Sequence, residues 1–183
     1  GVQTCALPIF QADWPQGAKF PGSTMTGHDA LALHFPRSSL VKVLIVKLTS
    51  LGDVIHTLLA ARELVTARPE VQLHWVIDEQ FASVLAACPF VHHIHPIPLR
   101  RLGLRLWKSP WLQAIRGLRE HAFDAVIDAQ GLTKSALISA LTKRSPSGRR
   151  WALAIQTKGS SYEAPTRWVA DHAVHTPWHI HAI

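Results

Sequence analysis

Four residues near position 50 interrupt two apolar stretches, and their types suit ligand binding and proton transfer. They offer two hydroxyl groups, a backbone position without a side chain and a carboxylate: Thr49, Ser50, Gly52 and Asp53. The preceding run, 41–46, is almost wholly apolar, as in a strand buried on both faces of a parallel sheet. Apolar residues then recur at the spacing of one helix face. The four residues are therefore predicted at the carboxyl end of a strand and the start of a helix, where open α/β sheets bind their ligands.

The carboxylate at this turn has two interpretations. Asp53 could cap free amides and complement the helix dipole, which is the commoner role of an isolated Asp at a helix start. It could instead accept a proton from a substrate hydroxyl as a general base. Lys47 could present a cation to the same turn, and the neighbouring hydroxyl groups could either cap the helix or bind a ligand. The turn is neither a GxGxxG nor a Walker loop, so the residues alone leave these alternatives open.

A second strand end carries a similar polar turn in the segment 128–135, Asp-Ala-Gln-Gly-Leu-Thr-Lys-Ser. The carboxyl ends of parallel strands meet at one edge of a sheet, so this turn is predicted to face the same cleft as Asp53. Its candidate substrate-binding residues are Gln130, Gly131, Lys134 and Ser135. An ordinary helix start, with a strand-terminal Asp held by amides, is an equally good interpretation.

The densest basic cluster lies in a connection broken by prolines, 96–110. It contains Arg100, Arg101 and Arg105, with Lys108 nearby. The connection follows the third predicted strand, which puts the cluster on the same edge of the sheet as Asp53. Such a cluster is either a solvated loop or a binding site for carboxylates and phosphates, which guanidinium groups contact in bidentate fashion.

The composition indicates a single globular domain with a substantial core. The 183 residues are 48% hydrophobic and 17% charged, and their net charge of +7 favours anionic partners such as phosphorylated lipid, a membrane surface, sugar nucleotides or nucleic acid. The two cysteines, Cys5 and Cys88, indicate neither a disulfide framework nor a zinc site and are typical of a reducing cytoplasm. No apolar run is long enough to span a membrane.

Strands and helices alternate from residue 40, which predicts an α/β fold: a Rossmann-like parallel sheet with helices on both faces. The predicted strands are 41–46, 71–77, 91–95, 125–128 and 151–155, and the predicted helices are 53–67, 79–87, 111–122 and 132–142. A loop is expected at 145–148, and 156–183 is expected to be mostly irregular. Residues 1–39 lack sustained periodicity and are interpreted as an irregular or foreign N-terminal extension.

Three segments in this order, 41–57, 124–139 and 162–174, resemble the N-terminal half of the lipopolysaccharide heptosyltransferase I family. That family consists of inverting, metal-independent glycosyltransferases of the GT-B type, in which two Rossmann-like domains face each other across a cleft. The resemblance implies that 40–183 is the N-terminal acceptor-binding domain, that the C-terminal donor domain is absent, and that this chain is an inactive fragment. It implies no cofactor.

The resemblance also implies roles for the candidate residues. Asp53 matches the catalytic carboxylate of the family, a general base on the acceptor hydroxyl, and Arg100 and Arg101 match a basic loop that meets the anionic acceptor. Arg105 matches only with a short insertion. The implied reaction transfers heptose from ADP-L-glycero-beta-D-manno-heptose to Kdo of lipid A-Kdo2, at the cytoplasmic face of the bacterial inner membrane.

Two other functions are considered. Heptosyltransferase II or another relative shares the Gly-Asp turn, and a non-catalytic module that binds anionic lipid would also explain the charge. Nucleic acid is disfavoured, because no aromatic platform with interleaved basic residues stands out. The twelve histidines are predicted to form no metal site, because the groups at 92–95 and 172–181 lack metal-ligand spacing with an acidic partner.

Overall fold

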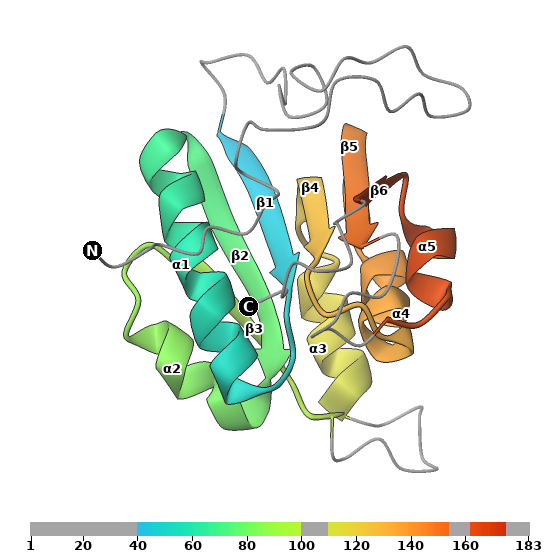
Figure 1. Cartoon of the computed structure of the whole chain (residues 1–183), viewed down its shortest axis with the longest axis horizontal. Helices are drawn as coiled ribbons and strands as arrows, with labels where there is room; N and C mark the ends of the chain where they lie inside the picture. Colours follow the sequence, from blue (N-terminus) through green and yellow to red (C-terminus); the bar gives the residue numbers. More distant parts are fainter. Residues whose placement is uncertain (1–39, 100–109, 154–161, 175–183) are drawn as a thin grey trace, which may run out of the picture.

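The computed structural model describes residues 40–99, 110–153 and 162–174. Within these ranges six strands form one sheet, in which every neighbouring pair is parallel and the order is β3-β2-β1-β4-β5-β6 (Figure 1). This is the strand order of the Rossmann fold, in which the order reverses beside the first strand. The predicted α/β fold with a parallel sheet is therefore confirmed.

The strands are β1 (Val41–Val46), β2 (Val71–Asp78), β3 (His93–Ile97), β4 (Ala122–Asp128), β5 (Lys143–Leu153) and β6 (His172–Val174). The helices are α1 (Leu51–Ala67), the 3-10 helix η1 (Glu79–Phe81), α2 (Ala82–Ala86), α3 (Pro110–Leu118), α4 (Thr133–Leu141) and α5 (Pro165–Val169). The predicted elements from β1 to α4 are all present. The largest shift is in the fifth strand, predicted at 151–155, because β5 begins eight residues earlier at Lys143. Smaller shifts occur in α3, which ends at Leu118, and in β4, which begins at Ala122.

Helices cover both faces of the sheet, as predicted. On one face, Val54, Leu58 and Leu64 of α1 and Leu85 of α2 pack against alternate residues of β1 and β2. On the other, α3 and α4 contribute Ile115, Leu118 and Ile138, which pack against the intervening strand residues. The central strands are thus buried on both sides, which explains why β1 is a nearly unbroken apolar run.

The loop predicted at 145–148 lies inside β5 instead. The pairing of β4 with β5 shifts register between Phe123 and Ala125, so these four residues form a bulge opposite Asp124. Ser145 donates to Asp124 Oδ1 at 2.7 Å. A Cβ atom at Gly148 would lie 2.4 Å from the carbonyl oxygen of Phe123, so the bulge requires glycine there.

The prediction that 156–183 is mostly irregular is wrong for α5 and β6. The strand β6 pairs with β5 through Trp151, Ala152 and Leu153. The Asp171 carboxylate beside it accepts from the Arg150 amide at 2.7 Å and pairs with the Arg144 guanidinium. Elements this short have no clear periodicity of their own, and neighbouring strands and helices stabilise them.

Candidate active site

The turn after β1 holds Asp53 in the first turn of α1. The Ser50 amide donates to Asp53 Oδ2 at 3.1 Å, so the carboxylate satisfies one of the free amides at the helix start. Its side chain nevertheless remains 40% exposed. None of the described residues donates to Oδ1. Asp53 therefore caps α1 with one oxygen, while the other has no donor among the described residues, so the two interpretations of this residue are compatible.

Lys47 supplies the nearest positive charge. Its Nζ lies 3.6 Å from Asp53 Oδ2 and donates to the carbonyl oxygen of Ala129 at 3.1 Å, although the side chain is only 11% exposed. Burial lowers the pKa of the Lys47 ammonium, and the charges of Asp53 and Asp128 oppose that shift. The ammonium thus lies between the two turns and stabilises an anion at Asp53.

The turn after β4 is organised around a second carboxylate, Asp128. Its Oδ1 accepts from the amides of Gln130 and Gly131 at 2.9 and 3.0 Å, and its Oδ2 accepts from the Ser135 hydroxyl at 2.9 Å. The residue is 4% exposed. Burial raises the pKa of the Asp128 carboxyl, and the hydrogen bonds from its three donors oppose that shift. Gly131, with a φ of 77°, allows the backbone to turn within reach of Asp128.

Gln130 joins the two turns. Its Oε1 accepts from the amides of Leu48 and Thr49 at 3.0 and 3.1 Å, and a backbone hydrogen bond from Ala129 to Val46 lies beside them. The turn that carries Asp53 is therefore held in place by the turn after β4. Gln130 is predicted to bind substrate, and the structure adds a positioning role for its side-chain oxygen.

Glu163 covers the start of α4. Its Oε2 accepts from the Thr133 amide at 2.6 Å and also from the Thr133 hydroxyl, while its own amide donates to Gly131. These hydrogen bonds lower the pKa of the Glu163 carboxyl. The segment before α5 is thereby attached to the second turn, so an anchoring contact comes from a part of the chain with weak periodicity.

The predicted site residues differ in accessibility. Ser50, Gly52 and Lys134 are exposed, Lys47 and Thr49 are half-buried, and Gly131 and Ser135 are buried. The Ser135 hydroxyl donates within the second turn, so the described contacts give it a supporting role. Arg100, Arg101 and Arg105 lie outside the described residues, and their roles stay predictions.

Of the two interpretations of the second turn, the contacts of Asp128 support a strand-terminal Asp held by amides. The sequence interpretation missed the Ser135 hydroxyl as its third donor, and the signal that could have found it is the spacing of an Asp at a strand end from a Ser seven residues later. The sequence prediction on metal sites also left out His74 and His121, because it considered only histidines close together in the sequence. The structure brings both beside His95, on the face covered by α3.

Residues 111–177 match glycosyltransferase family 9 (heptosyltransferase). This part of the chain is thus similar to the members of glycosyltransferase family 9. Within that family, lipopolysaccharide heptosyltransferase 1 of Pseudomonas aeruginosa is 41% identical over 110 residues, which are 58% of this chain and 31% of that enzyme. The enzyme of the same name from Salmonella typhimurium is 34% identical over 146 residues, 73% of this chain and 44% of the relative.

The similarity extends to three dimensions. The structure of Escherichia coli heptosyltransferase WaaC with ADP-2-deoxy-2-fluoro heptose matches 78% of this chain and 44% of WaaC, with a TM-score of 0.65 and 31% identity. The structure of WaaC with ADP matches with a TM-score of 0.63. The resemblance drawn from three sequence segments is confirmed, and so is the fold as one half of the GT-B type. The chain spans less than half the length of these relatives.

Among the helices in the described ranges, none has the length and apolarity needed to cross a bilayer.

Proposed function

We propose that residues 40–183 form the N-terminal, acceptor-binding domain of a lipopolysaccharide heptosyltransferase I, with Asp53 as the general base. The observation that carries this proposal is the half-exposed Asp53 carboxylate beside the Lys47 ammonium, at the carboxyl edge of a Rossmann-like sheet. The similarity to heptosyltransferase 1 enzymes supports the substrate class. In this proposal 1–39 is an extension without a catalytic role.

The proposed reaction joins a Kdo hydroxyl of lipid A-Kdo2 to heptose from ADP-L-glycero-beta-D-manno-heptose. As the hydroxyl oxygen bonds to the anomeric carbon, its proton passes to Asp53. The bond from that carbon to the ADP oxygen breaks on the opposite face, ADP leaves with the electron pair, and the configuration inverts. A carboxylate is sufficient as the base if bond cleavage precedes proton transfer.

The other candidate residues have proposed roles around this step. Thr49, Ser50, Gly52, Gly131, Lys134 and the loop residues Arg100, Arg101 and Arg105 bind the anionic acceptor. Gln130 and Ser135 support the turns. The donor is held mainly by a second domain, as expected for a GT-B enzyme, and catalysis requires both substrates in one closed cleft. WaaC has been solved with ADP and with an ADP-heptose analogue, which supports the donor class. The acceptor implies an enzyme at the cytoplasmic face of the inner membrane.

The test uses the full-length enzyme that carries this domain, with Asp53→Ala and Asp53→Asn. Loss of a general base should lower kcat about 100- to 10,000-fold, while the affinity for ADP-heptose changes little. Transfer to lipid A-Kdo2 would be followed by release of ADP. The matched control is Glu63→Gln, which removes an exposed carboxylate from the same helix.

Near-normal turnover of both Asp53 variants, or an equal loss in Glu63→Gln, would contradict the assignment. A parallel assay with an acceptor that already carries heptose separates the type I from the type II reaction. Consumption of the heptosylated acceptor alone would show that the substrate is misassigned while the catalytic base is not.

A further inference from the structure

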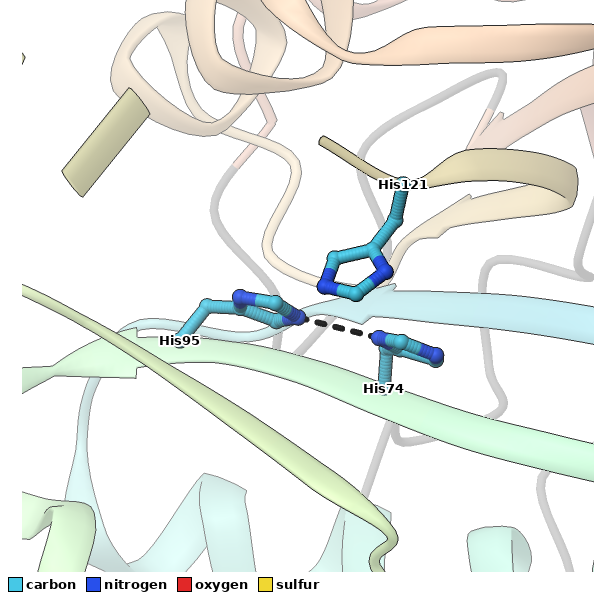
Figure 2. A group of neighbouring side chains, drawn as sticks. All are labelled: His74, His95 and His121. Atoms are coloured by element: carbon cyan, nitrogen blue, oxygen red, sulfur yellow. Dashed lines mark hydrogen bonds between the residues drawn. The ribbon is translucent and has the colours of Figure 1, made fainter. Parts of the chain in front are cut away.

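Three histidines meet on the face of the sheet that α3 covers, away from the candidate active site. His74 lies on β2, His95 lies on β3 and His121 lies in the turn before β4, and the three rings point toward one another (Figure 2). One ring nitrogen of each lies within 4.8 Å of the others. The cluster is near the amino ends of β3 and β4, whereas Asp53 follows the carboxyl end of β1.

The hydrogen bonding of His74 is incomplete. The residue is fully buried, and its Nδ1 lies 3.0 Å from His95 Nε2, so these two atoms share one proton. Its other nitrogen, Nε2, is buried and has no hydrogen-bond partner among the described residues. A buried polar side-chain atom without a partner is uncommon in folded proteins and indicates a bound water beside this nitrogen, because an ion held by Nδ1 would leave Nε2 protonated and still in need of an acceptor.

The surroundings of the cluster combine burial with other imidazole rings. Burial, followed by the neighbouring histidines, lowers the pKa of His74 to about 3 and that of His95 to about 4. The other groups that face them are His93, stacked on His74 with ring centroids 4.4 Å apart, and Lys42, whose charge opposes a cation.

We propose that His74, His95 and His121 bind one divalent transition-metal ion of the zinc class. Imidazole nitrogens are preferred ligands of such ions, and three of them leave a coordination position for water. With bonds of about 2.0–2.1 Å, tetrahedral ligand nitrogens lie about 3.3 Å apart. The pair formed by His74 and His95 is already near that separation at 3.0 Å.

His121 is the ligand that has to adjust. It is half-buried in a turn after α3, where a rotation of its ring would shorten the longest nitrogen separation. The ion would take the place of the proton shared by the other two rings and would link β2, β3 and the turn before β4. The site lies away from Asp53, and it departs from the sequence prediction of no metal site, which grouped His95 with its neighbours in the sequence.

The test uses the whole 183-residue chain, prepared without a polyhistidine tag and treated with a chelator. Calorimetric titration with Zn²⁺ should show one tight site per chain, and saturating Zn²⁺ should raise the melting temperature. His95→Ala and His121→Ala should each weaken binding by at least about 100-fold, because even partners outside the first coordination sphere change metal affinity about 10- to 100-fold. His56→Ala, at an exposed position on α1, should change nothing.

Co²⁺ provides a measurement on the unmodified chain, independent of how the variants fold. A strong visible absorption band, typical of a four-coordinate ion, is expected and should disappear on addition of Zn²⁺. The proposal is overturned by a weak, six-coordinate spectrum, by unchanged Zn²⁺ affinity in folded His95→Ala and His121→Ala, or by an equal loss in His56→Ala.

Discussion

The turns after β1 and β4 each combine a strand end, a short polar segment and a helix start, yet their carboxylates have different environments. Asp53 accepts one backbone hydrogen bond, and its side chain is 40% exposed. Asp128 accepts from two amides and a hydroxyl and is 4% exposed. The number of internal donors therefore distinguishes them: one carboxylate is left available for a substrate proton, and the other holds its turn together.

The largest effect on stability is expected at the buried carboxylate. Asp128→Ala would leave two amides and the Ser135 hydroxyl without their acceptor, and should lower the free energy of unfolding by about 2–4 kcal/mol. Asp53→Ala removes one hydrogen bond at a helix start and the ion pair with Lys47, whose ammonium keeps its hydrogen bond to Ala129, and should cost only about 1 kcal/mol. Urea unfolding of the 183-residue chain, followed by circular dichroism, measures both.

Asp128→Asn is the control for this difference, because it keeps an oxygen that can accept from the two amides. It should lose clearly less stability than Asp128→Ala. Similar losses for Asp53→Ala and Asp128→Ala would show that the two turns do not differ in the way their contacts indicate.

The sequence predicted both turns but could not distinguish their roles. Strand β1 and the start of α1 follow from an apolar run, a polar turn and helical spacing, all of which are local signals. Whether a carboxylate is exposed depends on the conformation of the backbone around it. At Asp128, the positive φ of Gly131 lets the turn place two amides against the carboxylate. The capping of α4 by Glu163 joins positions thirty residues apart, and no local pattern reveals it.

The second prediction concerns Gln130, which makes one turn depend on the other. Gln130→Ala should expose the amides of Leu48 and Thr49 and lower the free energy of unfolding by about 1–2 kcal/mol. Hydrogen exchange followed by NMR should show faster exchange at these two amides. Gln130→Glu retains an acceptor oxygen and should restore part of their protection.

Gln113→Ala, at an exposed position on α3, is the matched control and should leave both amides unchanged. If exchange at Leu48 and Thr49 were the same in Gln130→Ala as in the unmodified chain, the two turns would be independent, and Gln130 would be left with only its predicted contact to substrate.

The smallest effect on stability is expected at Gly52. This residue also tests whether the turn after β1 binds the acceptor. A Cβ atom there would meet nothing within 4 Å, so the protein itself does not require glycine at this helical position. Gly52→Ala should raise the free energy of unfolding by up to about 1 kcal/mol, because alanine loses less conformational entropy in a helix.

The same substitution tests acceptor binding. If the acceptor approaches the backbone at Gly52, the added methyl group should raise the KM for the acceptor severalfold in the full-length enzyme, while kcat changes little. Gly117→Ala on α3, also open within 4 Å, should stabilise similarly without changing KM. An unchanged acceptor KM in Gly52→Ala would mean that the open space beside Asp53 is not where the acceptor lies, and the partial exposure of that carboxylate would then need another explanation.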